Sequence, residues 1–254
     1  MREVVRKLDL GIQPLSMSII LCYCGAVRIS EIFYSIQGEG RLIGVPSVFI
    51  RTSGCNLRCR WCDTPYTSWR PEGSSWSVEK ILREAARYPL THVVITGGEP
   101  LLAPEIAELC RQIKQRGAHI TVETAATVFK RLDCDLISLS PKLANSTPWR
   151  KAGGKFAAMH ERRRLNLPAI QMFLDAHDYQ LKFVVEERQD FAEIGEIVSE
   201  LNNVDPVRVL IMAQGTTGRE LGRKAKWIIE LCKRYGYAYT PRLHIQLFGN
   251  RRGT

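Results

Sequence analysis

The stretch THVVITGGEPLLAPEIAELCRQIKQRGAHITVET, residues 91–124, decides the fold class. A short apolar run rich in β-branched residues (92–96) precedes a helical pattern (103–117), and a second such run (118–123) follows. Strand, helix and strand in this order are typical of two parallel strands joined by a crossover helix. The stretch therefore predicts an α/β protein with a parallel sheet.

The same alternation extends along most of the chain. Strand-like runs lie near 47–52, 92–96, 118–123, 134–139, 179–185 and 207–212. Six parallel strands are too few for a closed eight-stranded barrel, so we expect an open, partial TIM-like barrel. No full helix fits between the third and fourth runs, and residues 143–178 show no regular pattern. Some of the crossover helices are therefore expected to be reduced to loops.

Composition sets limits on the compartment and the partners. The chain has 254 residues, of which 45% are hydrophobic and 24% charged, as in an ordinary soluble domain with its own core. A net charge of +10 would attract polyanions, but the basic residues are scattered and their runs are short. No stretch reaches the roughly 18 to 20 apolar residues that span a bilayer. We expect a cytoplasmic protein that binds neither nucleic acid nor membrane.

Residues 1–27 form a separate N-terminal extension. Basic residues and then an apolar run imitate a signal peptide faintly, but Glu3 and Asp9 interrupt the basic part and no cleavage site follows. The sequence predicts that this extension is poorly ordered, or that translation starts at Met17 and the assigned start codon lies too far upstream. Cys22 and Cys24 are expected to carry no chemistry. The catalytic domain is then expected to span 28–254.

Unusual residues follow the predicted strands repeatedly. Cysteine follows the first strand, and the later strands end at Thr96-Gly97-Gly98-Glu99, Glu123-Thr124, Ser140-Pro141-Lys142 and Gln214-Gly215-Thr216-Thr217. In barrels of this kind the carboxyl ends of the strands carry the active site. We expect these residues to meet at one rim.

Three of the eight cysteines, Cys55, Cys59 and Cys62, are close together. This spacing is more typical of metal ligands than of a disulfide framework. A closed zinc site needs a fourth ligand, and Cys110 and Cys134 lie in apolar helix and strand patterns typical of packed thiols. A [4Fe–4S] cluster held by three thiolates leaves one iron open. The three cysteines therefore favour such a cluster.

The spacing Cys-x3-Cys-x2-Cys, with Trp61 before the last cysteine, resembles the radical S-adenosylmethionine (SAM) superfamily. GGEP at 97–100 resembles the motif with which that superfamily binds the SAM ammonium group. The resemblance implies that the open iron binds the amino and carboxylate groups of SAM. An electron from the reduced cluster would then cleave SAM to a 5′-deoxyadenosyl radical.

Five further motifs resemble a narrower family, the 7-carboxy-7-deazaguanine synthases. They are FYSIQGEG (33–40), FIRTSGCN (49–56), CDT (62–64), SPK (140–142) and LHIQLFGNRRG (243–253). Members of this family are lyases of the queuosine pathway, which contract 6-carboxy-5,6,7,8-tetrahydropterin to 7-carboxy-7-deazaguanine with loss of ammonia. The family tends to have tryptophan where Phe248 stands, and residues 1–27 lie outside the match.

The resemblance also implies roles for individual residues. Cys55, Cys59 and Cys62 would hold the cluster, and Thr64 would bind Mg²⁺, with Asp63 orienting the site from beside it. Other residues would contact SAM: Gly98, Glu99, Ser140, Pro141, Lys142, Gln214, Gly215, Thr216 and Thr217. The pterin would meet Ile36, Gln37, Gly38, Arg51, Thr96, His244 and the terminal carboxylate of Thr254.

Arg51 is the expected clamp for the substrate carboxylate, because a planar guanidinium can bind a carboxylate through two hydrogen bonds. Glycine at 38 would let the backbone approach the edge of a flat heterocycle, to which Gln37 offers both a donor and an acceptor. The resemblance further implies an electron donor such as flavodoxin or ferredoxin, and a homodimer.

Two alternatives remain open at this point. An activating enzyme that installs a glycyl radical on a protein partner shares the cysteine spacing, but it would not need IQGEG, Arg51 or a Mg²⁺ ligand. A zinc-stabilised, basic nucleic-acid-binding module would account for the charge and the cysteines without catalysis. Colour separates the last alternative from the others, because a reconstituted iron–sulfur protein is brown.

Overall fold

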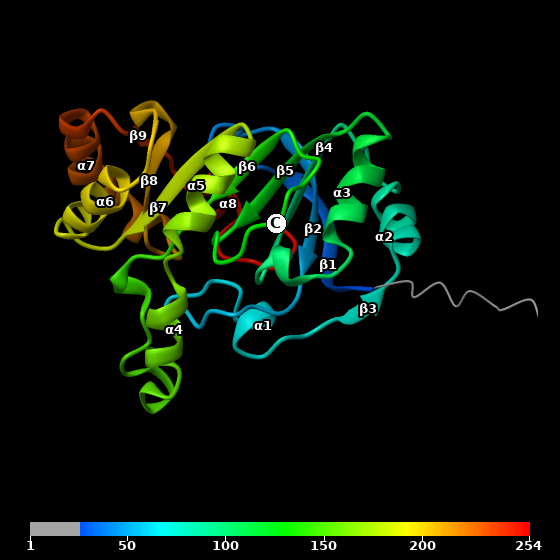
Figure 1. Cartoon of the computed structure of the whole chain (residues 1–254), viewed down its shortest axis with the longest axis horizontal. Helices are drawn as coiled ribbons and strands as arrows, with labels where there is room; N and C mark the ends of the chain where they lie inside the picture. The colour runs from blue at the N-terminus through cyan, green and yellow to red at the C-terminus, as the bar shows by residue number, and fades with distance from the viewer. Residues whose placement is uncertain (1–25) are drawn as a thin grey trace, which may run out of the picture.

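A computed structural model describes residues 26–254 of the chain. It contains one nine-stranded sheet in the order β3-β1-β2-β4-β5-β6-β7-β8-β9 (Figure 1). The strands are β1 (Val27–Ile36), β2 (Pro46–Thr52), β3 (Ser74–Trp76), β4 (His92–Gly97), β5 (His119–Thr124), β6 (Leu136–Leu139), β7 (Tyr179–Val185), β8 (Val209–Ala213) and β9 (Ala238–Tyr239). From β2 to β9 all neighbours are parallel, whereas β1 is antiparallel to both β2 and β3. The predicted open, mostly parallel α/β sheet is confirmed.

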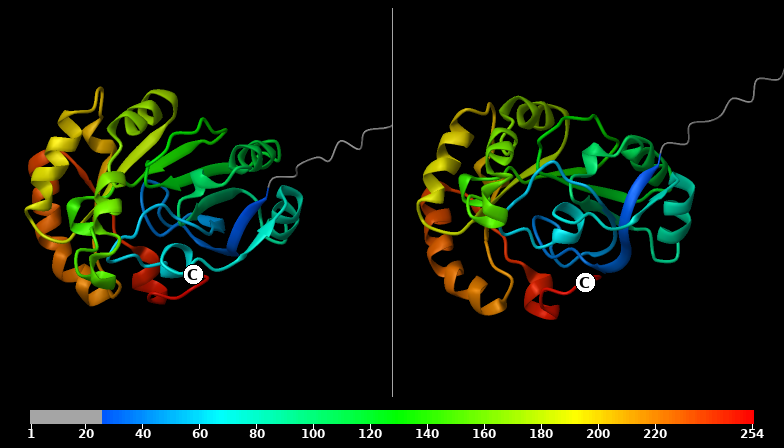
Figure 2. Two further views of the ribbon diagram at one scale, coloured as in Figure 1. Left: turned by 60° about the horizontal axis from the view of Figure 1, so that its bottom comes forward. Right: turned by 90° about the horizontal axis from the view of Figure 1, so that it is seen from below.

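Eight helices lie around the curved sheet within residues 26–254, and most of them cover its outer side (Figure 2). They are α1 (Pro65–Ser68), α2 (Val78–Ala85), α3 (Ile106–Lys114), α4 (Ala157–Arg163), α5 (Leu167–Ala176), α6 (Asp190–Ser199), α7 (Gly218–Tyr235) and α8 (Leu243–Phe248). Short 3₁₀ turns η1 (Pro100–Leu102), η2 (Ala144–Ser146), η3 (Lys151–Gly154) and η4 (Pro206–Arg208) connect them. As predicted, β5 reaches β6 without a helix.

Two parts of the prediction were wrong in detail. Strands β1, β3 and β9 were missed, because β1 has no regular alternation of buried and exposed residues and the other two are very short. Residues 143–178, expected to be irregular, contain α4 and α5. The start of α5 did carry a signal, since Asn166 caps it by accepting from the Ala169 N–H and Pro168 stands in its first turn.

The expectations for residues 1–25, including Met17, Cys22 and Cys24, lie outside the described residues. Strand β1 begins at Val27, one residue before the predicted domain boundary. No helix within 26–254 has the length and apolar character needed to cross a membrane.

Successive side chains of each parallel strand point alternately into the hydrophobic core and toward the concave side of the sheet. In β7 every residue is buried, yet Leu181 and Phe183 join the main hydrophobic core, whereas Lys182 and Val184 line the pocket on the concave side. Since successive side chains of a strand point to opposite faces, each strand supplies both layers. The sheet is thus buried on both faces, and every second residue is available to the site.

The turn after β1 joins the first half of the chain to the last. Gly40 N–H donates to Thr240 Oγ1 (2.7 Å), and Leu243 N–H donates to the Gly38 carbonyl (2.9 Å). At Gly38 a Cβ atom would stand 1.9 Å from Nδ1 of His244, so only glycine allows this approach. The IQGEG turn and the C-terminal segment therefore form one wall.

Candidate active site

A pocket of about 530 Å³ lies where the parallel strands end, on the concave side of the sheet. The pocket is lined by the three cysteines, the Mg²⁺ candidate, all seven residues expected at the pterin and five of the nine expected at SAM. They are Cys55, Cys59, Cys62, Thr64, Ile36, Gln37, Gly38, Arg51, Thr96, His244, Thr254, Gly98, Ser140, Lys142, Gln214 and Gly215. The structure therefore brings together residues that are more than 200 positions apart.

The cysteine loop is held by hydrogen bonds from three directions. Gly54 N–H donates to the Thr67 carbonyl (2.8 Å), and Trp69 Nε1–H donates to the Cys59 carbonyl (3.0 Å). Arg58 N–H donates to Nδ1 of His160 on α4 (3.0 Å). Because the backbone is fixed in this way, all three thiols face the same pocket.

The thiols are free, and burial changes their acidity. Burial raises the pKa of Cys55 to about 11 and that of Cys59 to about 12. Both are therefore protonated at neutral pH when no metal is bound, and loading of a metal must release protons. Leu57 N–H donates to the Cys55 sulfur (3.3 Å), a contact suited to a thiolate ligand.

Within residues 26–254 no three Cys, His, Asp or Glu side chains stand close enough to hold a single metal ion. In a [4Fe–4S] cluster each thiolate binds a different iron, so its thiols are spaced more widely than those around one zinc ion. The three free thiols in one pocket fit the cluster and not a closed zinc site. Cys110 is fully buried in the core, as expected for a packed thiol.

The GGEP segment packs directly against the cysteine loop. Gly97 has φ +136°, and a Cβ on Gly98 would stand 2.1 Å from the Gly54 carbonyl oxygen. Glu99 N–H donates to that same carbonyl (2.9 Å). The two glycines therefore allow the end of β4 to touch the cluster-binding backbone.

Glu99, which is expected to contact SAM, is not among the residues that line the pocket. Its carboxylate is buried and accepts from Thr124 Oγ1 (2.7 Å), Ala125 N–H (2.8 Å) and Leu101 N–H (3.1 Å). These acceptors are already used within the protein. Glu99 braces the loops after β4 and β5, and the glycines are the part of the motif that reaches the pocket.

Three other residues expected at SAM also lie outside the pocket lining, namely Pro141, Thr216 and Thr217. Thr217 is the N-cap of α7 and forms a capping box with Glu220, which also accepts from Thr216 N–H (3.0 Å). Their polar groups therefore begin the helix, and Gln214 and Gly215 are the residues of this loop that face the cavity.

The pterin side of the pocket centres on Glu123, which was noted at the end of its strand but given no role. Its carboxylate accepts from Gln37 Nε2 (3.2 Å) and from Thr96 Oγ1 (2.8 Å). Strand alternation could have found it, because Ile120 and Val122 of the same strand enter the core and Glu123 must face the other way. Three polar side chains thus form one patch that offers both donors and acceptors.

Arg51 is held in place, but part of its guanidinium group remains available to a ligand. Its Nε–H donates to Glu31 Oε1 (2.6 Å), and its guanidinium carbon lies 5.4 Å from the centre of the Phe33 ring. The two Nη groups have no protein partner within the described residues.

Thr64, the residue expected to bind Mg²⁺, also lines the pocket. It is the N-cap residue of α1, but its side chain makes no cap hydrogen bond.

Comparison with known proteins identifies the family. Residues 49–179 match the Radical SAM superfamily. The chain is 47% identical over 230 residues to the 7-carboxy-7-deazaguanine synthase of Rhodopirellula baltica, covering 90% of this chain and 89% of that protein. It is 43% identical over 235 residues to the enzyme of that name from Halobacterium salinarum, covering 89% and 91%.

The chain belongs to the 7-carboxy-7-deazaguanine synthase family. The crystal structure of QueE from Escherichia coli shares the fold, with a TM-score of 0.66, 24% identity and coverage of 86% of this chain and 95% of that one. Radical SAM chemistry depends on a [4Fe–4S] cluster and SAM, and this synthase family also uses Mg²⁺. The glycyl-radical and zinc-module alternatives are thereby set aside.

A buried ionic network connects the motifs of this synthase family member, and sequence reasoning missed it. Glu39 accepts from Lys182 Nζ and from Arg242 Nε (3.0 Å), while Arg242 also donates to Asp63 and to the Gly215 carbonyl (2.7 Å). The sequence did contain one sign of it, because Lys182 lies inside an otherwise apolar strand. Burial of an unpaired ammonium costs several kcal/mol, so Lys182 needs a buried acidic partner. All four side chains line the pocket.

The network fixes the charges of its members. Burial alone would raise the pKa of Glu39, but the attraction of Lys182 and Arg242 outweighs it and holds that pKa well below its ordinary range. Burial also opposes ionisation of Asp63, yet the Arg242 guanidinium lowers its pKa. For His244, burial lowers the pKa, so the imidazole is neutral at pH 7. The floor of the pocket therefore contains matched charges around a neutral histidine.

Proposed function

We propose that the chain is a radical SAM lyase that converts 6-carboxy-5,6,7,8-tetrahydropterin to 7-carboxy-7-deazaguanine with loss of ammonia. The observation that carries this proposal is the division of one pocket into two halves. One half holds the three free thiols and Gly98, and the other holds Gln37, Thr96, Glu123 and the open fork of Arg51. A radical source and a polar heterocycle would thus lie against each other.

When bound, the cluster and SAM supply the 5′-deoxyadenosyl radical that removes a hydrogen atom from C6 of the pterin. The protein positions the substrate for that step. The Nη groups of Arg51 bind its carboxylate through two hydrogen bonds, and the Glu123 patch exchanges its internal hydrogen bonds for the donors and acceptors of the pterin edge. Neutral His244 closes the pocket beside Gly38.

Thr64 would supply one oxygen ligand for Mg²⁺, a hard ion that accepts oxygen donors and can retain several waters. Asp63 stands next to it with a lowered pKa, so its carboxylate is charged and can accept from metal-bound water. The Arg242 hydrogen bond fixes the direction of that carboxylate. Thr64 and Asp63, which both line the pocket, would therefore hold Mg²⁺.

Anaerobic turnover tests the proposal. Reconstituted protein should be brown, contain about four irons per chain and, with a reductant, SAM, Mg²⁺ and the carboxytetrahydropterin, release a deazapurine product that mass spectrometry identifies. Cleavage of SAM without loss of ammonia from the pterin would contradict the substrate assignment. A colourless protein that retains zinc would contradict the reaction class.

Two finer features remain predictions of the family resemblance. We expect a homodimer, which light scattering coupled to size-exclusion chromatography would detect as twice the mass of 28.8 kDa. We also expect a one-electron carrier such as flavodoxin or ferredoxin as the physiological reductant.

A further inference from the structure

Positive charge is concentrated in two segments that contain or cover the cysteine loop. Residues 54–70 and 142–164 together contain ten Lys and Arg residues against only two acidic ones, Asp63 and Glu161, a net charge of +8. The whole chain of 254 residues carries +10. Most of the net positive charge of the chain therefore lies in these two segments, although most of its basic residues lie elsewhere.

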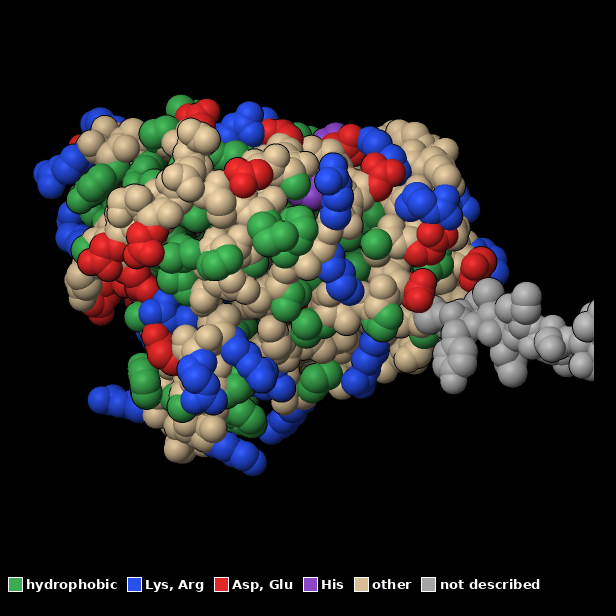
Figure 3. Space-filling view, viewed as in Figure 1, with side chains coloured by type: hydrophobic (Ala, Val, Ile, Leu, Met, Phe, Trp, Pro, Cys, Tyr) green, Lys and Arg blue, Asp and Glu red, His purple; other side chains and the backbone are tan. Residues whose placement is uncertain are grey.

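Most of this charge is uncompensated. We define the α4 basic surface as Arg150, Lys151, Lys155, Arg162 and Arg163, all of which are exposed and none of which forms an ion pair within residues 26–254. Figure 3 shows Lys and Arg side chains projecting in several directions from the lobe that contains α4. The nearby acidic groups are already used, since Asp63 pairs with Arg242 and Glu161 with Arg164.

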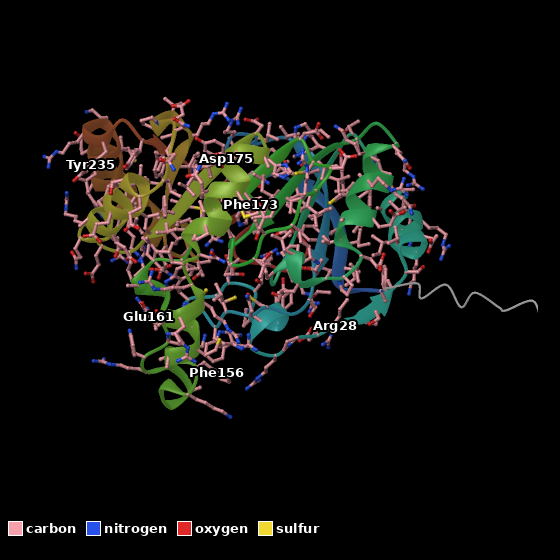
Figure 4. The ribbon with its side chains drawn as sticks, viewed as in Figure 1. Arg28, Phe156, Glu161, Phe173, Asp175 and Tyr235 are labelled. Carbon is pink, nitrogen blue, oxygen red and sulfur yellow. The ribbon has the colours of Figure 1, made fainter. Side chains whose placement is uncertain are left out.

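This surface lies on the cysteine loop. Lys151 Nζ donates to the Arg60 carbonyl (3.0 Å), and Arg60 N–H donates to the Ser146 carbonyl (2.8 Å). The Phe156 ring, at the base of α4 (Figure 4), packs edge-on against Trp69 with ring centres 5.6 Å apart. Trp69 in turn donates to the Cys59 carbonyl. The α4 basic surface therefore touches the cluster-binding backbone directly through Lys151, and Phe156 and Trp69 pack between α4 and Cys59.

An exposed aromatic residue stands beside the charges. Trp149, next to Arg150, is 63% exposed, although large apolar side chains are usually covered. Tryptophan and arginine are the residue types most enriched among those that contribute most to protein–protein binding. A basic surface with an exposed aromatic side chain beside it suits an acidic protein partner.

We propose that the α4 basic surface is the docking site for a small acidic one-electron carrier protein that reduces the cluster. This rests on the proposed function, because reductive cleavage of SAM needs one electron that neither SAM nor the pterin provides. In the docked complex the reduced carrier loses one electron and the cluster gains it. No bond is formed and no proton moves. Charge complementarity speeds association of such pairs and weakens as salt screens it.

Charge reversal tests the docking site. The triple variant Arg150→Glu/Arg162→Glu/Arg163→Glu removes charge from the surface without touching a residue of the pocket. The matched control Arg219→Glu/Arg223→Glu/Lys226→Glu makes the same charge change on exposed residues of α7, away from α4 (Figure 1). Turnover of each protein is measured with enzymatically reduced flavodoxin and, separately, with dithionite, at low and high ionic strength.

We expect the α4 variant to lose about tenfold or more of its flavodoxin-driven rate at low salt while its dithionite-driven rate and iron content stay within about twofold of wild type. The α7 control should keep both rates. Trp149→Ala, which preserves the charge, should weaken the flavodoxin-driven reaction alone.

Equal flavodoxin-driven rates in the two triple variants would overturn the docking site. Tight RNA binding that the α4 substitutions abolish, with unchanged flavodoxin kinetics, would assign the surface to nucleic acid and overturn it as well. A wild-type protein that is inactive with dithionite would instead contradict the proposed function, so the two failures are distinguishable.

Discussion

Single side chains in the pocket are oriented by protein partners before any ligand binds. Arg51 is held from one side by Glu31, which also accepts from the Tyr66 hydroxyl (2.9 Å), and Phe33 lies beneath its guanidinium. A guanidinium group fixed in this way loses little conformational freedom when it binds a carboxylate. Residues that are pre-positioned in this manner should show their effects mainly in binding.

Replacement of Arg51 by alanine should therefore raise the apparent KM for the pterin about tenfold or more, which corresponds to about 1.5–3 kcal/mol for hydrogen bonds to a charged group. Iron content and SAM cleavage without substrate should not change, because the cysteines belong to the other half of the pocket. Arg51→Lys should restore little, since an ammonium cannot bind bidentately. Steady-state kinetics checks this, and unchanged kinetics would contradict the carboxylate clamp.

Replacement of Cys59 by alanine should abolish both cluster assembly and SAM cleavage, because three thiolates are the minimum that holds the cluster. Cys110→Ala, at a buried position of α3, should leave cluster assembly and SAM cleavage intact while lowering the stability of the fold. Iron analysis and the visible spectrum after anaerobic reconstitution measure the difference. Retained SAM cleavage in the Cys59 variant would refute the cluster assignment.

At the scale of elements, the segment between β6 and α5 supports the cysteine loop. His160 of α4 is fully buried, accepts from Arg58 N–H through Nδ1 and contacts Ser146 Oγ through Nε2 (2.9 Å). Because Nδ1 is an acceptor, the proton of the neutral ring lies on Nε2, and Ser146 accepts it. Burial lowers the pKa of His160 to about 4, so this arrangement persists at neutral pH.

Removing this support should loosen the cluster without removing a ligand. His160→Ala leaves the Arg58 N–H without its partner, at a cost of about 1–3 kcal/mol, and should speed the loss of iron in a chelator challenge. His160→Asn, whose amide oxygen can accept in place of Nδ1, should recover part of the retention. Replacement of His177, which lies beyond the end of α5 and contacts no cluster residue, serves as the control. Identical iron-loss rates in all variants would refute the supporting role.

At the scale of the whole molecule, the buried ionic network links the start of the chain to its end. Arg242 joins Glu39 of the turn after β1, Asp63 of the cysteine loop and Gly215 of the SAM-side loop. The matched charges are costly to bury and favourable only as a complete set. Its loss should therefore affect global stability as well as the pocket.

Arg242→Gln should lower the free energy of unfolding by about 3–5 kcal/mol at pH 7, because it leaves the buried Asp63 carboxylate without its main partner and Glu39 with Lys182 alone. In wild type the lowered pKa of Glu39 stabilises the fold above its ordinary value of 4.5, and this contribution is lost as pH falls toward the lowered pKa. The variant lacks the part of this contribution that Arg242 supplies, so the difference in unfolding free energy between variant and wild type should narrow below about pH 4.5. Urea unfolding at pH 7 and pH 4 measures this, and a deficit independent of pH would contradict it.

Local sequence determined a large part of the architecture. Apolar runs such as YQLKFVVE and the helical patterns after them depend on interactions between near neighbours, so the six central strands, the parallel sheet and the open barrel could be predicted. Cysteine spacing and short motifs located the cluster and most of the pocket in the same way. Strand β1 was missed because its alternation of buried and exposed residues is irregular. Helix α5 was missed because its cap at Asn166 was not recognised, and α4 begins without a side-chain cap.

Only the tertiary structure decided how distant groups share one site. Glu99 carries a recognisable motif, yet the acceptors of its carboxylate are used by residues of the next strand, and no local pattern reveals that. The partners Lys182 and Arg242 of Glu39 lie 143 and 203 positions along the chain. Concentration of charge over the cysteine loop likewise results from packing of α4 against it. Such pairings depend on which surfaces the folded sheet brings within a few ångströms, and distance along the sequence does not encode that.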